Sequence, residues 1–211
     1  MKKHSSFPYK LYLVISQADC KGQNFLTIAE QAILGGVDVI QLREKNDLTE
    51  TYIRKAFQLK EITTKHQIPL IINDNIEVAK KVDAIGIHVG TKDITPTEIR
   101  NQWSETKCIG YSIEYLEQLG NEQVVLSDYL GISPVFKTPT KTDTITEWGL
   151  DGIRTMRNLT DKPLVAIGNI RLNNLKSVIK AGADCIAVVS AICSATNPQK
   201  AAYELKNEIL K

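Results

Sequence analysis

The sequence predicts an α/β protein, a single-domain (β/α)8 TIM barrel that spans residues 1–211. Short apolar segments alternate with stretches of helical spacing along the chain, and eight such pairs can be counted. The apolar segments are nearly continuous, as expected for parallel strands that are buried on both faces. Eight pairs suffice to close a barrel, and a barrel with short loops needs about 200 residues.

The strands are expected where three to five mostly apolar residues follow one another. In chain order they read LYLVI at 11–15, VIQL at 39–42, PLII at 69–72, AIGIH at 84–88, CIG at 108–110, YLGI at 129–132, LVAI at 164–167 and CIAVV at 185–189. Each strand is followed by apolar residues at helical spacing, near 25–34, 48–66, 77–81, 95–103, 114–119, 146–158, 172–180 and 198–210. Within 48–66 we expect Ile53, Phe57 and residues 59–62 to face inward.

The order of these elements favours parallel strands joined by right-handed crossovers. A Gly-(Val/Ala)-Asp-x-Ile pattern recurs at 36–40 and 182–186, at two returns from helix to strand. No Pro/Ser-rich linker marks a domain boundary. The pattern therefore indicates one closed barrel.

Composition and charge argue against several classes of partner. The formal net charge is +2, from 26 basic and 24 acidic residues, so the whole molecule has no pull toward nucleic acid or membrane. The basic N-terminus is followed by no apolar stretch of signal-peptide length. We expect a cytoplasmic protein without nucleic-acid or membrane partners, and a homo-oligomer is compatible with the sequence. The four scattered cysteines are expected to be reduced thiols, namely Cys20, Cys108, Cys185 and Cys193.

Polar side chains follow seven of the eight predicted strands. The carboxyl ends of TIM-barrel strands meet at one mouth, where active sites form. Arg43, Lys45 and Lys141 are cations that can converge there, and such a cluster favours phosphate or diphosphate. Asp74 and Asp93 follow adjacent strands and offer the oxygen ligands of a Mg2+ site, which water and substrate phosphate would complete.

A second anion site is expected after the seventh and eighth strands. Gly168 and Asn169 precede one predicted helix, and Ser190 follows the last strand. Backbone N–H groups at this place bind phosphate in many TIM barrels. The sequence thus predicts two anion sites, one rich in cations and metal and one built from backbone.

Several of these residues also have a structural interpretation. Asp74 could cap the following helix, because Asp and Asn favour that position, and Asp93 could belong to a turn. Lys45 alone could be a solvated surface lysine. His88 is expected to lie in the core or behind the site rather than to carry protons. The coincidence of polar residues at so many strand ends favours a site.

The motifs at these strand ends resemble those of the thiamine-phosphate synthase family. In order they are QLREK at 41–45, IND at 72–74, GIHVG at 86–90 with Asp93, GYS at 110–112, PVFKTPTK at 134–141, AIG at 166–168 and AVVSAI at 187–192. The segment at 134–141 is the most specific. The resemblance runs from Leu11 to the final helix.

The resemblance implies a transferase of thiamine biosynthesis. The family joins 4-amino-5-hydroxymethyl-2-methylpyrimidine diphosphate to a thiazole phosphate, giving thiamine phosphate and pyrophosphate. Diphosphate departs first, and the thiazole nitrogen captures the resulting pyrimidine-methyl cation. Positioning and charge stabilisation can carry such a reaction without a general base.

The resemblance also implies roles for individual residues. The pyrimidine diphosphate is expected at Gln41, Leu42, Arg43, Glu44, Lys45, Asn73, Ser112 and Lys141. The thiazole phosphate is expected at Thr138, Pro139, Thr140, Gly168, Val189 and Ser190. Lys45, Ser112 and Lys141 are the expected catalytic residues, and Asp74 and Asp93 the expected Mg2+ ligands.

Three positions depart from the family pattern. Asn75 stands where the family often has Arg, and this removes one cation near the diphosphate. Asn169 replaces a glycine, although Asn tolerates left-handed backbone and keeps its N–H. Glu114 lies where many members have His.

Two alternatives remain open at this stage. A related thiazole tautomerase shares the barrel but needs proton-transfer groups, usually histidines. This sequence has only His4, His66 and His88, and His66 falls at the wrong end of the barrel. A thiamine-phosphate-binding protein with weakened catalysis is the other alternative, supported only by Asn75 and Asn169.

Overall fold

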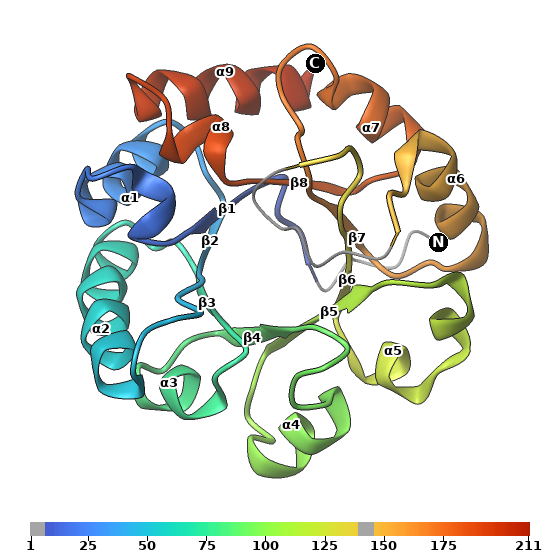
Figure 1. Cartoon of the computed structure of the whole chain (residues 1–211), viewed down its shortest axis with the longest axis horizontal. Helices are drawn as coiled ribbons and strands as arrows, with labels where there is room; N and C mark the ends of the chain where they lie inside the picture. The colour runs from blue at the N-terminus through green and yellow to red at the C-terminus, as the bar shows by residue number, and fades with distance from the viewer. Residues whose placement is uncertain (1–6, 139–145) are drawn as a thin grey trace.

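The structure, a computed structural model, describes residues 7–138 and 146–211. Its parallel strands pair in chain order and β8 pairs with β1, so the sheet closes into a barrel. The helices form a ring around the strands (Figure 1). The predicted TIM barrel is confirmed. The strands are β1 (Leu11–Ile15), β2 (Val39–Leu42), β3 (Leu70–Asn73), β4 (Gly86–Val89), β5 (Cys108–Ile113), β6 (Tyr129–Ile132), β7 (Leu164–Ala166) and β8 (Cys185–Val188).

The outer ring differs from the prediction in a few places. Its helices are α1 (Phe25–Leu34), α2 (Thr49–Lys65), α3 (Ile76–Lys81), α4 (Pro96–Gln102), α5 (Glu122–Leu126), α6 (Gly149–Leu159), α7 (Leu175–Ala181), α8 (Ser190–Cys193) and α9 (Pro198–Leu210). The described residues also form the 3-10 helices η1 (Ala18–Cys20) and η2 (Leu116–Gly120). The helix expected at 114–119 is thus η2, and η1, α5 and α8 were not predicted because they are too short for a periodic pattern.

The second helix buries a different face from the one expected. Phe57 is 45% exposed, so the expectation that it faces inward is wrong. The buried stripe of α2 consists of Tyr52, Ala56, Leu59 and Thr63. These four recur at spacings of three and four, whereas Phe57 lies one position off the stripe.

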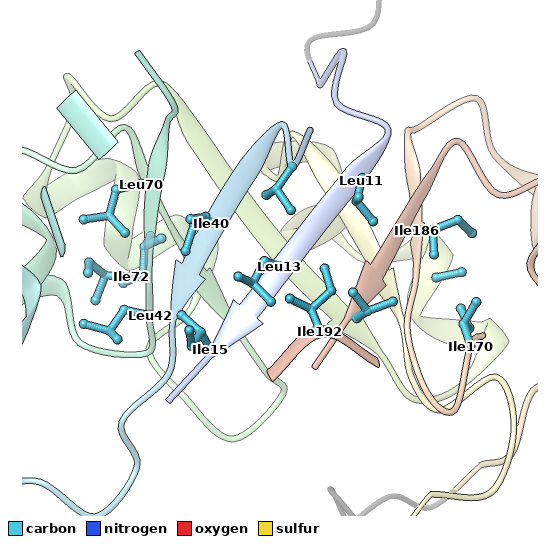
Figure 2. Packing of buried hydrophobic residues seen from close by; sticks show 14 of the residues in the cluster. Leu11, Leu13, Ile15, Ile40, Leu42, Leu70, Ile72, Ile170, Ile186 and Ile192 are labelled. Carbon is cyan, nitrogen blue, oxygen red and sulfur yellow. The ribbon is translucent and has the colours of Figure 1, made fainter. Parts of the chain in front are cut away.

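Alternation along each strand builds two layers of core. In β1, Leu11, Leu13 and Ile15 point outward, against the helices, whereas Tyr12 and Val14 point into the barrel. Figure 2 shows the outward layer, in which aliphatic side chains of neighbouring strands lie side by side. Both faces of the strands are therefore buried, which explains the continuous apolar runs in the sequence.

The cysteines and helices bear on two further expectations. All four cysteines are buried and free, as predicted. Within the part of the chain that the structure describes, no helix is both long and apolar enough to cross a membrane.

Three aspartates repeat one arrangement at the amino ends of the strands. Asp38, Asp128 and Asp184 each precede an even-numbered strand and accept a backbone N–H near the start of the preceding strand. The donors are Leu11 at 2.8 Å, Ile109 at 2.7 Å and Leu164 at 2.8 Å. Each aspartate also pairs with a cation on an outer helix: Lys206, Arg100 and Arg157, respectively. This arrangement accounts for the Gly-(Val/Ala)-Asp-x-Ile pattern as a tie between sheet and helices.

Removing one of these aspartates should lower the free energy of unfolding without changing the residues at the barrel mouth. Asp128→Ala leaves the Ile109 N–H and the Arg100 guanidinium without this acceptor, and we expect a loss of about 2–3 kcal/mol in the free energy of unfolding. Urea denaturation measures it, with the exposed Asp161→Ala as control. A loss no larger than that of the control would contradict the structural role of Asp128.

Candidate active site

The first cavity, called here the β2–β5 cavity, has a volume of about 100 Å3. It lies at the carboxyl ends of the strands, inside the barrel mouth. Most of the residues predicted for the diphosphate and metal line it, namely Gln41, Arg43, Lys45, Asn73, Asp74, Asp93 and Ser112. The structure thus brings together side chains from β2, β3, β5 and the loop after β4.

Alternation along the chain divides the QLREK segment. Gln41, Arg43 and Lys45 face the β2–β5 cavity, whereas Leu42 belongs to the outer core. The Glu44 carboxylate accepts the Gln17 backbone N–H at 2.8 Å and pairs with Lys55 at 2.9 Å. Side chains at successive extended positions point to opposite faces, so five consecutive residues cannot all reach one ligand. The side-chain placement does not favour the predicted substrate contacts of Leu42 and Glu44.

Asp74 lines the β2–β5 cavity and does not cap the following helix. Its backbone is left-handed, with φ of 60°, and its N–H donates to the carbonyl of His88 at 2.9 Å. The cap of α3 is Asn75, whose side chain accepts the Val78 N–H at 3.0 Å. The structural interpretation of Asp74 as the cap is therefore wrong, and the departure at Asn75 has a structural explanation.

The two carboxylates and one lysine form an electrostatic group at the cavity. Lys45 Nζ lies 2.9 Å from Asp74 Oδ2. Burial raises the pKa of Asp74 and the neighbouring Asp93 raises it further, while Lys45 opposes the rise. Asp93 Oδ2 also accepts the backbone N–H of Gly90 at 2.8 Å. Asp93 therefore makes the expected turn contact and also lines the cavity.

This group fits the requirements of Mg2+. Two carboxylates that disfavour each other's charge offer hard oxygen donors at a place where added positive charge is stabilising. Across residues 7–138 and 146–211, no group of three His, Cys, Asp or Glu side chains forms a protein-only metal cage. Two carboxylates with water and phosphate oxygens suit Mg2+, because this ion keeps several waters.

The hydroxyl of Tyr52 links the ends of β2 and β3 through hydrogen bonds to their backbones. The Tyr52 hydroxyl on α2 donates to the Leu42 carbonyl at 2.7 Å and accepts the Asn73 N–H at 3.2 Å. Asn73 is only 6% exposed and lines the cavity. The helix side chain thereby sets the spacing of the two strand ends that carry Gln41 and Asn73.

The second cavity, called here the β7–β8 cavity, has a volume of about 80 Å3. The residues predicted for the thiazole phosphate that line it are Thr138, Gly168, Val189 and Ser190. Arg43 lines both cavities, so the two predicted anion sites meet at its side chain. An open groove of about 900 Å3 continues outward from Thr138 and Ser190.

After β7, Arg171 was not assigned a role from the sequence, whereas Asn169 was expected at the backbone-built anion site. Arg171 lines the β7–β8 cavity, and its Nε donates to Asn169 Oδ1 at 3.1 Å. Asn169 has φ of 49° and donates through Nδ2 to the carbonyl of Lys137 at 3.2 Å. The departure at Asn169 is thus tolerated by the backbone and adds a contact to Arg171.

Other predicted residues fall elsewhere. Pro139, Thr140 and Lys141 lie outside the described residues. Glu114 Oε2 accepts the Thr91 hydroxyl at 2.9 Å beside the loop that carries Asp93. His66 ends α2 and lies 3.1 Å from Glu30, away from the cavities.

The chain closely matches known proteins along nearly its whole length. The family model described as thiamine monophosphate synthase matches residues 11–192. A thiamine-phosphate synthase of Albidiferax ferrireducens is 44% identical over 200 residues, covering 95% of this chain and 91% of the relative. Thiamine-phosphate synthase 1 of Streptococcus pneumoniae is 38% identical over 203 residues, covering 94% and 97%. The solved structure of a thiamine phosphate pyrophosphorylase from Pyrococcus furiosus superposes with a TM-score of 0.87 at 29% identity, covering 97% of both chains.

The fold and its two cavities place the chain among TIM-barrel enzymes equipped for phosphorylated substrates. The family model and the relatives make the assignment specific. The chain belongs to the thiamine monophosphate synthase family.

Proposed function

We propose that this member of the thiamine-phosphate synthase family, a transferase that condenses a pyrimidine and a thiazole unit into thiamine phosphate, acts by Mg2+-assisted loss of diphosphate. The substrates would be the pyrimidine diphosphate and the thiazole phosphate. The observation that carries the proposal is the meeting of the two cavities at Arg43, with paired carboxylates beside one of them.

The bond changes need no proton acceptor. The bond between the pyrimidine methylene carbon and the diphosphate oxygen breaks, and its electron pair leaves with the diphosphate. The thiazole nitrogen then donates its lone pair to the methylene carbon and forms the new C–N bond. The protein must therefore hold two ligands in line and stabilise the charge on the leaving group.

Residues of the β2–β5 cavity would hold the leaving group. Arg43 and Lys45 supply positive charge, and Ser112 supplies a hydroxyl on the facing strand. Asp74 and Asp93 would hold Mg2+, which when bound supplies positive charge to the departing diphosphate. The ion pair of Lys45 with Asp74 positions its ammonium group beside this place.

Residues of the β7–β8 cavity would hold the thiazole phosphate. Gly168 lets the backbone turn with φ of 117°, and Ser190 lines the same cavity. Arg43 lines both cavities, so ligands in the two cavities would lie next to each other at its side chain. This arrangement supports capture of the cation by the second substrate in place of water.

The tautomerase alternative finds little support. That reaction needs a group that gives and takes protons at the thiazole. His66 pairs with Glu30 on the helical ring. His88 is bonded through both ring nitrogens, to Tyr129 and Ser112, in the β2–β5 cavity rather than beside Ser190.

Pyrophosphate release tests the proposal. We expect release from the pyrimidine diphosphate only when both thiazole phosphate and Mg2+ are present, and loss of release on addition of EDTA. Release without Mg2+ would overturn the metal's role. Absence of release under every condition, with tight binding of thiamine phosphate, would favour the binding-protein alternative.

The cellular setting and assembly remain predictions. Cytoplasmic location, the lack of nucleic-acid and membrane partners, and a homo-oligomer rest on the sequence alone. Size-exclusion chromatography with light scattering would decide the oligomeric state.

A further inference from the structure

We infer that Gln41, Tyr12, Tyr129, His88 and Ser112 form a hydrogen-bonded chain with one direction, which turns the Ser112 hydroxyl proton toward the substrate. We call it the Gln41–Ser112 chain. The inference deepens the proposed function and rests on it for the identity of the ligand. Its three inner members, Tyr12, Tyr129 and His88, would be positioning residues.

The five side chains cross the barrel interior from β2 to β5. Gln41 Nε2 lies 2.8 Å from the Tyr12 hydroxyl, which lies 3.0 Å from the Tyr129 hydroxyl. The Tyr129 hydroxyl lies 2.9 Å from Nδ1 of His88, and Nε2 of His88 lies 3.0 Å from Oγ of Ser112. All four distances are those of good hydrogen bonds.

Proton counting gives the chain its direction. The amide nitrogen of Gln41 can only donate, so the Tyr12 oxygen accepts. The single proton of Tyr12 then goes to Tyr129, and the single proton of Tyr129 goes to Nδ1 of His88.

The imidazole completes the sequence of donors. Because Nδ1 of His88 accepts, the neutral ring carries its proton on Nε2 and donates it to Ser112 Oγ. The Ser112 oxygen accepts this bond, so its own proton is directed away from His88, toward the cavity that Ser112 lines. A hydroxyl presented in this way donates to an anion, such as a diphosphate oxygen.

Burial keeps this direction from reversing. Tyr12 and Tyr129 are 1% and 0% exposed, so a hydroxyl proton without a partner there would be costly. Burial also raises the pKa of both phenols, and they stay protonated. The Phe7 ring, with its centroid 4.2 Å from that of Tyr129, covers the pair on one side.

Two glycines leave space for the side chains of the Gln41–Ser112 chain. A Cβ at Gly110 on β5 would overlap the Tyr129 hydroxyl and Nδ1 of His88. A Cβ at Gly131 on β6 would come within 3.0 Å of the His88 ring and 3.5 Å of Ser112 Oγ. β5 and β6 therefore carry glycine where the Gln41–Ser112 chain passes them, which supports the inference that these hydrogen bonds are a specific feature of the barrel interior.

The tautomer of His88 tests the direction in the free protein, whatever the substrate. In 15N-histidine-labelled protein, His4→Gln and His66→Gln identify the remaining signals as those of His88. We expect a neutral ring with its proton on Nε2 and an unprotonated Nδ1. A proton on Nδ1, alone or in a doubly protonated ring, would overturn the inference.

A double-mutant cycle tests the action through Ser112. We expect Tyr129→Phe to lower kcat about 10- to 100-fold with little change in KM, since one donor to the leaving group is misdirected. Ser112→Ala should cost at least as much, and the double variant no more than Ser112→Ala alone. Multiplying effects would overturn action through Ser112.

The controls separate this inference from the proposed function. Tyr111→Phe changes a buried tyrosine in the outer core of β5 and should keep turnover within about twofold. If Tyr129→Phe failed to fold, the same cycle with Tyr12→Phe would replace it. Failure of pyrophosphate release in the unchanged protein would sink the proposed function, whereas the tautomer measurement would still decide the direction of the chain.

Discussion

Replacing Asp74 by asparagine is expected to lower turnover by about 100- to 10,000-fold while leaving the free protein at least as stable as before. The loss follows from the proposed metal site. A bound ion supplies several kcal/mol of charge stabilisation to the leaving diphosphate, and a neutral amide holds Mg2+ far less well than a carboxylate.

The stability of the variant follows from the strain that Asp74 carries. Burial raises the pKa of Asp74, so the charged form that prevails at neutral pH is disfavoured in the folded state. Its backbone is left-handed, a conformation that asparagine also adopts readily. The amide therefore removes a penalty and loses only the half-exposed contact with Lys45.

Thermal unfolding with and without Mg2+ separates the metal from the fold. The unchanged protein should gain stability when Mg2+ is added, because a ligand that binds only the folded state shifts the equilibrium, and Asp74→Asn should not. Asp83→Asn is the matched control. Asp83 also has a left-handed backbone, with φ of 48°, but precedes β4 at the opposite end of the barrel. An equal Mg2+ shift in Asp74→Asn and the unchanged protein would remove Asp74 from the metal site.

The strands could be predicted because their sequence signal is local and redundant. A strand that is buried on both faces has apolar residues at nearly every position, so β1 and β2 can be recognised in the sequence as segments rich in Leu, Ile and Val. The polar residues at the strand ends could also be predicted to lie together, because a barrel of parallel strands brings the carboxyl ends of all its strands to one mouth. The resemblance added the substrate groups and the metal that these residues are expected to bind, but not the orientation of the side chains.

The orientation of side chains could not be read from the motifs. The QLREK segment appears as one unit in sequence, yet alternation sends Glu44 to Lys55 and Lys45 to Asp74. Which of Asp74 and Asn75 caps α3 likewise depends on one backbone angle, because both residue types favour caps.

The Gln41–Ser112 chain of hydrogen bonds could not be predicted from the sequence, for a different reason. Tyr12 and Tyr129 occur inside apolar runs, where they look like ordinary core residues. Their hydroxyls meet only because the barrel closes and brings together the interior side chains of β1 and β6, which are not neighbours in the sheet. Such a contact between residues 117 positions apart has no local signature.

Gly168→Ala is expected to weaken the thiazole phosphate site selectively, raising KM for the thiazole phosphate about 10- to 100-fold. Gly168 has φ of 117°, which alanine adopts only with strain. A Cβ there would also lie 2.6 Å from Pro134 Cβ and 2.8 Å from Val135 N. The backbone at the β7–β8 cavity must therefore shift, and its N–H groups would no longer point toward the phosphate.

The matched control separates backbone strain from displacement of the cavity. Gly22→Ala carries a positive φ of 86° but places its Cβ in open space, so it should lower stability slightly and leave both KM values unchanged. Steady-state kinetics with each substrate varied in turn makes the comparison. Because Gly168 belongs to the β7–β8 cavity alone, the KM for the pyrimidine diphosphate should change little. Equal rises in both KM values would mean that the two cavities do not hold separate substrates, and the division at Arg43 would have to be abandoned.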